Sequence, residues 1–147
     1  MKTINKINKM KTLVASLLVV TTVCLGMFSS AFAGNTTDTS YQFHNTSTRE
    51  TTEGREKTDT TKVYVRPTSG PALRYSVRGA NNADGDGAVV LSGSFEIYNG
   101  TRASITNYVY ETGKPYAQLH FERIAYADAW TYGVWSPDST QNYTVYG

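Results

Sequence analysis

The sequence predicts an all-β protein, an antiparallel β-sandwich with jelly-roll-like or partly closed barrel topology and seven to nine short strands. Three observations support this prediction. Apolar and polar residues alternate with a period of two in several short runs, and turn residues separate these runs. After residue 33, the chain keeps all eleven tyrosines and both tryptophans but only three leucines and no methionine. No long stretch has the spacing of an amphipathic helix.

Residues 1–33 are predicted to be a cleaved secretory signal peptide. Four lysines form a positively charged start, residues 13–28 form an almost continuous apolar stretch, and Ala31 and Ala33 are the small residues of a cleavage site before Gly34. The apolar stretch has about 16 residues, whereas a membrane-spanning helix needs roughly 20. We therefore expect a secreted or cell-surface protein that has no membrane segment after cleavage.

Cleavage would change both the charge and the redox chemistry of the chain. The only cysteine, Cys24, lies in the apolar stretch, so the processed chain could form no disulfide and no thiolate metal site. Four of the 14 basic residues would also leave, and ten would remain against 12 acidic residues, a net charge of −2. Nucleic-acid binding needs a concentrated basic face. We therefore expect no nucleic-acid partner.

The processed chain, 147 minus 33 or 114 residues, has the length of one domain with a modest core. Residues 34–61 are predicted to be a polar lead-in with one short strand, in which Tyr41 and Phe43 share a face. The polar run at 46–61 is interpreted as a mobile segment or an exposed edge. The β-sandwich domain is predicted to comprise residues 62–147.

Alternation and turn residues together locate the strands of the sandwich. Residues 73–78 give the clearest half-buried strand, because apolar side chains face one way and Arg or Ser face the other. Asn99-Gly100 separates the predicted strands 89–97 and 102–111, and Asn-Gly between two alternating runs predicts a tight hairpin. Further strands are expected at 63–66, 116–124, 130–135 and 142–146.

Three segments carry a resemblance to a known group of proteins: KTDTTKVYV at 57–65, ITNYVYETG at 105–113 and GVWSPDS at 133–139. In this order, they resemble segments of small exported proteins from clostridia and related Gram-positive bacteria. That group has no assigned activity, so the resemblance implies an uncharacterised exported protein and no catalytic residues.

The aromatic residues near the C-terminus are the candidate ligand-binding residues: Trp130, Tyr132 and Trp135. In an extended segment, Trp130 and Tyr132 share one face and Trp135 lies on the opposite face, so one sheet cannot bury both sets. The set left outside would form an aromatic platform for sugar rings or for the apolar surface of a partner. For Trp135, a place in the core is the favoured interpretation.

A partial calcium site is the one cofactor that the sequence suggests. Asn82, Asp84 and Asp86 alternate as oxygen ligands do at the start of a calcium loop, and Gly87 occupies its sixth position. The twelfth position is Gly93 instead of a bidentate glutamate, which excludes an EF-hand. A flexible turn rich in Asn, Asp and Gly is the favoured interpretation.

No catalytic set is recognisable, and we expect no enzymatic activity. Neither histidine, His44 nor His120, stands in a nucleophile or metal spacing. Three glutamates lie in or near predicted strands, and nothing selects a glycosidase-type pair from them: Glu96, Glu111 and Glu122.

Two functions remain. The first is a noncatalytic exported β-sandwich that acts by surface contact with cell-wall carbohydrate or an extracellular protein. The second is a secreted antibacterial, bacteriocin-like or signalling protein. The net charge of −2 disfavours a membrane-active agent, which needs a cationic or strongly amphipathic surface. The ligand and the oligomeric state are left unassigned under both functions.

Overall fold

The computed structural model describes residues 34–141 and 143–147, so the predicted signal peptide, with Ala31 and Ala33, lies outside the described residues. Residues Gly34–Gly147 form one compact unit. The described part of this unit is an all-β sandwich of two sheets, as predicted, and contains eleven short strands instead of seven to nine. The strands are β1 Thr39–His44, β2 Arg49–Thr51, β3 Arg55–Glu56, β4 Val63–Ser69, β5 Leu73–Ala80, β6 Val89–Val90, β7 Phe95–Ile97, β8 Ala103–Ile105, β9 Tyr116–Arg123, β10 Trp130–Ser136 and β11 Thr144–Tyr146.

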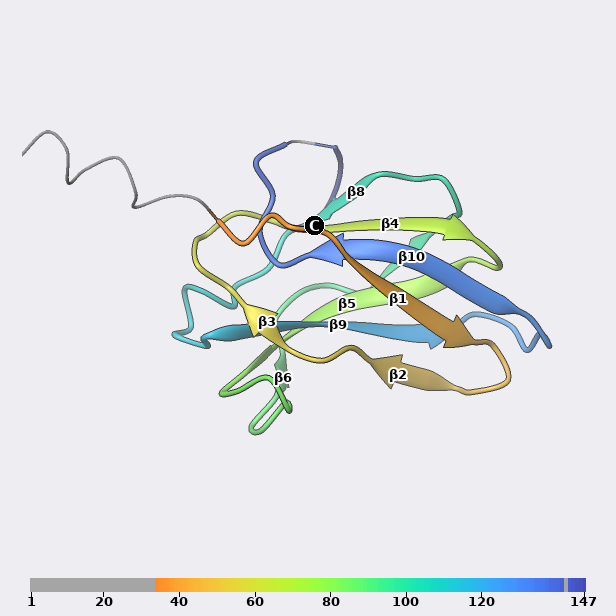
Figure 1. The fold of residues 1–147 in the computed structure, drawn as a ribbon, viewed down its shortest axis with the longest axis horizontal. Coiled ribbons are helices and arrows are strands. Elements are labelled where there is room, and N and C mark those ends of the chain that lie inside the picture. Colours follow the sequence, from red (N-terminus) through yellow and green to blue (C-terminus); the bar gives the residue numbers. More distant parts are fainter. Residues whose placement is uncertain (1–33, 142) are drawn as a thin grey trace, which may run out of the picture. The chain divides into compact units, whose positions relative to one another are not determined.

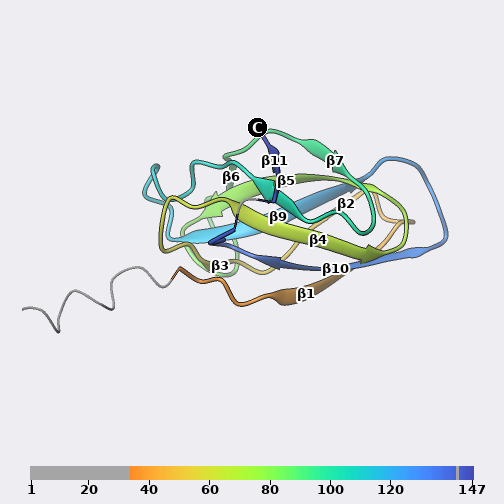
Figure 2. The same ribbon diagram turned by 90° about the horizontal axis from the view of Figure 1, so that it is seen from above.

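The first sheet has the strand order β1-β10-β4-β8-β11, and the second has the order β2-β9-β5-β6, with β3 on β9 and β7 on β5. β11 pairs with β8 in parallel, and all other named pairs are antiparallel. Figures 1 and 2 show β10 between β1 and β4, with β5 and β9 side by side in the other layer. None of the described residues forms a helix that could cross a membrane.

Alternating side chains from both sheets fill the core. β5 contributes Leu73, Tyr75 and Val77, and β9 contributes Ala117, Leu119 and Phe121, all almost fully buried. Aromatic rings join the two layers: the Phe121 centroid lies 5.3 Å from that of Tyr41 and 5.2 Å from that of Phe43 on β1. Aromatic and β-branched side chains thus fill most of a core that contains few leucines.

A buried hydrogen bond also crosses the core, between the hydroxyls of Tyr41 and Tyr75, whose oxygens are 2.8 Å apart. Burial raises the pKa of both phenols, and for Tyr41 the neighbouring Tyr75 raises it further. The Tyr41 ring packs directly over Gly133 of β10, where the Cε1 atom would lie 2.6 Å from a Cβ. Gly133 therefore provides the space that this ring occupies.

The predicted hairpin at Asn99-Gly100 is wrong. Gly100 has a φ of 84° and forms a turn, but β7 pairs with β5 in one sheet and β8 pairs with β4 in the other. The turn therefore carries the chain between the layers. The Gly100 amide donates to the Pro67 carbonyl at 2.8 Å, which is a contact with β4 and not with a hairpin partner.

The predicted strands around this turn are also too long. The run 89–97 is interrupted between β6 and β7, and the run 102–111 is a strand only at 103–105. Residues 108–114 form a compact turn, in which the amides of Thr112 and Lys114 donate to the carbonyls of Tyr108 and Val109. Tyr108 is consequently exposed on a loop and does not cover a sheet face.

The polar lead-in also differs from the prediction, because residues 34–61 contain three strands. β2 and β3 both pair with β9 at the edge of the second sheet. Their side chains are mostly polar because an edge strand has one solvent-facing side. Lys57, which follows β3, is buried.

Candidate functional site

The outer face of β10 carries the aromatic side chains that the sequence singled out. Trp130 and Tyr132 are each 44 % exposed, and their ring centroids are 6.3 Å apart with an interplanar angle of 27°. His44 of β1 pairs in register with Trp130 and stacks on the indole at 4.5 Å and 11°. We call these three side chains, His44, Trp130 and Tyr132, the aromatic ladder.

Hydrogen bonds hold the first ring of the aromatic ladder in place. His44 Nε2 lies 2.9 Å from Asp128 Oδ1, and His44 Nδ1 lies 3.0 Å from Thr46 Oγ1. Both ring nitrogens of His44 therefore have a hydrogen-bond partner, the carboxylate on one side and the hydroxyl on the other. The indole of Trp130 therefore rests on an oriented ring, which reduces the entropy lost when a ligand packs against it.

Trp135, the third candidate ligand-binding residue, belongs to the core, with 1 % of its surface exposed. Its side chain points to the inner face of β10, opposite to Trp130 and Tyr132. The Arg55 guanidinium lies 5.6 Å from its ring centroid and donates to the Trp135 carbonyl at 3.2 Å. Burial lowers the pKa of Arg55, and the charges of Asp38 and Asp138 oppose this shift.

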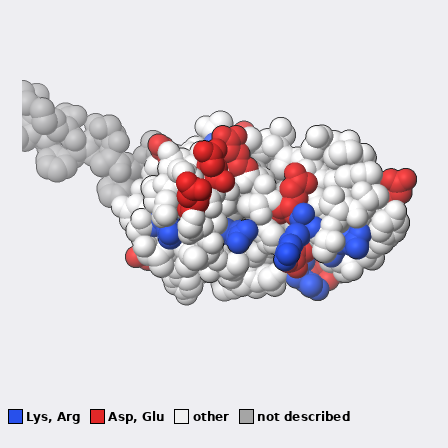
Figure 3. Space-filling view, turned by 90° about the horizontal axis from the view of Figure 1, so that it is seen from below, with Lys and Arg blue, Asp and Glu red and all other residues white. Residues whose placement is uncertain are grey.

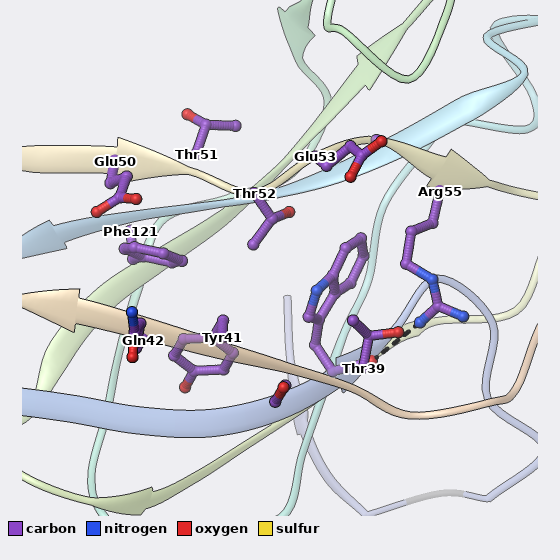
Figure 4. Close-up of a pocket in the computed structure, with 12 residues that line it drawn as sticks. Thr39, Tyr41, Gln42, Glu50, Thr51, Thr52, Glu53, Arg55 and Phe121 are labelled. Carbon is purple, nitrogen blue, oxygen red and sulfur yellow. Dashed lines mark hydrogen bonds between the residues drawn. The ribbon is translucent and has the colours of Figure 1, made fainter.

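A groove of about 560 Å³ opens between β1 and β2, the edge strands of the two sheets (Figure 4). Its floor consists of Tyr41, Phe121 and Trp135, all more than nine-tenths buried. Glu50 pairs in register with Phe121, so its carboxylate lies on the inner side of β2, where it blocks edge-to-edge pairing. The floor rings are engaged in core packing and offer a ligand little ring surface.

Charged groups of both signs line the groove, and few charged groups contact the aromatic ladder. Figure 3 shows one face of the molecule, on which Asp and Glu gather at the upper left, most Lys and Arg lie in a band below them, and most of the surface is uncharged. Glu50 and Glu53 line the groove together with Arg55, whereas the aromatic ladder has only Asp128 as a charged neighbour in the contacts above. Stacking and hydrogen bonding, not charge, are therefore the chemistry that the aromatic ladder offers.

The predicted calcium ligands lie in the turn between β5 and β6. Asn82 Oδ1 accepts hydrogen bonds from the amides of Gly85 and Asp86, both at 3.0 Å, and Asn82 Nδ2 donates to Asp86 Oδ2 at 2.8 Å. These bonds close an Asx turn, and Asp84 is exposed beside it. The favoured interpretation as a turn without calcium and the alternative of a partial calcium site both stay predictions.

The candidate titratable residues do not converge. His120 is held by Thr51 Oγ1 at 2.7 Å and lies 3.4 Å from Glu122 Oε1 on the outer face of the second sheet. Arg74 of β5 stands in register between Glu96 and Glu122, which separates these two carboxylates by two strand spacings. Within residues 34–141 and 143–147, no three His, Cys, Asp or Glu side chains are grouped to hold a metal ion.

Two features escaped the sequence analysis. The stacking of His44 on Trp130 depends on the register of β1 and β10, and no local pattern encodes it. The buried pair of Lys57 and Asp138 joins residues 81 positions apart, in segments that look like polar turns. Gly34, at the predicted cleavage site, approaches this pair, since a Cβ on it would lie 2.9 Å from the Asp138 Cβ.

Fold and site together define a small all-β sandwich with an exposed aromatic ladder on one sheet. A family model described as a protein of unknown function, DUF2712, matches residues 29–139. The chain therefore belongs to the DUF2712 family. No curated protein and no solved structure matches it.

Proposed function

We propose that this protein is a noncatalytic exported protein that binds cell-wall polysaccharide of a Gram-positive bacterium through the aromatic ladder. One observation carries the proposal: the half-exposed ring of Trp130 stacks on His44 at 4.5 Å and on Tyr132 at 6.3 Å, so three rings are arrayed along one outer sheet face. Aromatic rings pack against the apolar faces of sugars.

The surroundings of the aromatic ladder support a sugar ligand. Gln42 pairs in register with Tyr132 and is exposed, so its side-chain amide can donate to and accept from a sugar hydroxyl beside the phenol. The Tyr132 hydroxyl is a second such group. Polar groups at the rim of an apolar surface fix the orientation of a ligand, while the rings provide contact area.

Export is part of the same proposal. The arrangement of positive start, apolar stretch and small residues before Gly34 supports cleavage there, and the cleaved chain would carry a net charge of −2. That charge supports contact with a neutral wall polymer over attack on an anionic membrane. The protein would then act outside the cell.

The proposal is tested by retention of the purified protein on insoluble cell wall and on wall polysaccharide. We expect Trp130→Ala to lower retention by about two- to tenfold, since a stacked aromatic contact contributes about 0.5–1.5 kcal/mol. Tyr110→Ala is the matched control, because Tyr110 is 48 % exposed on a loop away from β10. Loss of retention in the control variant alone, or no retention on any glycan, would contradict the proposal.

A further inference from the structure

The most deeply buried charges of the described chain belong to Lys57 and Asp138. Both side chains have no exposed surface, and Lys57 Nζ lies 2.5 Å from Asp138 Oδ1. A buried ion pair loses the hydration of both ions, and this loss often exceeds their mutual attraction. The aromatic ladder makes no use of this pair, and a β-sandwich of this kind does not require it.

Three donors surround the other oxygen of the same carboxyl group. The Asn35 amide donates to Asp138 Oδ2 at 2.7 Å, the Thr58 amide at 3.2 Å and the Thr58 hydroxyl at 2.8 Å. Burial raises the pKa of Asp138, but the bond and charge of Lys57, with the bonds from Thr58 and Asn35, outweigh it and leave that pKa below its usual value. Asp138 therefore starts as a carboxylate in contact with Lys57 Nζ.

We propose that Lys57 and Asp138 form an intramolecular isopeptide bond, an amide between Lys57 Nζ and Asp138 Cγ. A proton first passes from the ammonium to the carboxylate within the pair, which leaves a neutral amine and a carboxylic acid. The amine lone pair attacks Cγ, and the electrons of the C=O bond move to Oδ2. Oδ1 then leaves with two protons as water when the carbonyl re-forms. No oxidant or reductant is needed.

The three donors on Oδ2 have the arrangement of an oxyanion hole for this step. They point to the oxygen that gains negative charge when the amine attacks, and they are fixed before the reaction. Two of the three are backbone amides, and all three belong to segments that the fold brings to Asp138 from more than 75 positions away in the sequence. The folded chain supplies this arrangement, so bond formation should follow folding.

Asp59 is the residue that can move the proton. Its Oδ1 lies 3.7 Å from Lys57 Nζ and accepts from the Thr61 amide at 2.8 Å. Proton transfer needs a shorter contact than this, so Asp59 Oδ1 would approach the nitrogen as it attacks, take a proton from it and pass that proton to the leaving oxygen, and the carboxylate is unchanged at the end. Lys57 and Asp59 lie in the 57–65 segment and Asp138 in the 133–139 segment singled out in the sequence.

The product fits the same surroundings. The Thr61 carbonyl, which accepts from Lys57 Nζ at 2.6 Å, would accept from the amide N–H, and the three donors on Oδ2 would bond the amide oxygen. Two buried charges become one neutral, fully hydrogen-bonded amide, which removes the desolvation cost of the pair. In a processed chain without cysteine, this bond would do what a disulfide does in other small exported domains.

The test is the intact mass of the full-length chain, or of its processed form with the N-terminus identified by fragmentation, measured in denaturant after folding. We expect a mass about 18 Da below that of the sequence, the loss of one water. Trypsin should release residues 56–62 covalently joined to residues 124–147. Folded protein of full sequence mass would overturn the proposal and leave an ordinary ion pair.

Three variants test which residues form the isopeptide bond and which residue moves the proton. Lys57→Arg keeps a positive charge but should have the full mass and a Tm lower by roughly 10 °C or more, because the cross-link would close a loop of about 80 residues. Asp59→Asn should accumulate uncross-linked chain. Lys62→Arg, a lysine exchange outside the pair, should keep the mass loss. Loss of water that persists in Lys57→Arg would also overturn the assignment.

Discussion

The contact between Tyr41 and Gly133 gives a sharp test of the packing between the two sheets. An alanine Cβ at Gly133 would lie 2.6 Å from Tyr41 Cε1 and still closer to the end of the ring. The ring must therefore move in Gly133→Ala, and it would lose both its contact with Phe121, 5.3 Å between centroids, and its hydrogen bond to Tyr75.

The expected cost follows from these two losses. Overpacking a core costs about 1–3 kcal/mol, and a buried hydroxyl left without its partner costs about 1–3 kcal/mol. Replacement of a strand glycine by alanine returns roughly 0.5–1 kcal/mol. We therefore expect Gly133→Ala to lower the free energy of unfolding by about 1–5 kcal/mol, measured by urea denaturation with tryptophan fluorescence.

A second background separates the clash from any other effect of the alanine. In Tyr41→Ala the ring is absent, so the additional change Gly133→Ala should be neutral or slightly stabilising. The two substitutions then couple by more than about 1.5 kcal/mol in a double-mutant cycle. A Gly133→Ala protein within about 0.5 kcal/mol of the unmodified one, or equal costs in both backgrounds, would refute the packing described for β1 on β10.

Three further predictions concern stability. Burial raises the pKa of Tyr41 and Tyr75, so in the unfolded chain these phenols ionise at lower pH than in the folded protein, and the stability that they contribute is complete below about pH 10 and falls as the pH rises. We expect Tyr41→Phe to make Tm fall less steeply with pH in the alkaline range, and an unchanged slope would contradict this. Adding calcium or a chelator should change Tm by less than about 1 °C, since Asn82 Oδ1 already accepts hydrogen bonds from two backbone amides. A saturable rise in Tm of several degrees with calcium would instead establish the calcium site. Trp135→Ala should cost about 3–5 kcal/mol in urea denaturation, and a cost under about 1 kcal/mol would show that this side chain is not in the core.

Local patterns correctly predicted those strands in which the alternation of apolar and polar residues alone shows which face is buried. The alternation at 73–78 became β5, and the alternation at 116–124 became β9, because each strand has one face in the core. The same period placed Trp130 and Tyr132 on one side of β10 and Trp135 on the other. This required no knowledge of which strands are neighbours.

The sequence patterns gave wrong predictions where the structure of a segment depends on the strand with which it pairs. Asn99-Gly100 forms the turn that the sequence indicates, but its flanking strands lie in different sheets, and turn chemistry does not specify a pairing. β2 and β3 are polar because they are edge strands, so composition alone described them as lead-in. The stack of His44 on Trp130 and the pair of Lys57 and Asp138 come from distant segments, and their distances exist only in the folded chain.

Tryptophan fluorescence during titration with wall polysaccharide tests the proposed binding surface most directly, because the two tryptophans have opposite environments. Trp130 is 44 % exposed in the aromatic ladder, and Trp135 is 1 % exposed in the core. The account predicts a saturable change in emission that persists in Trp135→Phe and disappears in Trp130→Phe, with both proteins folded. A saturable change that survives in Trp130→Phe would contradict binding at the aromatic ladder, and no change with any wall polysaccharide would contradict the function.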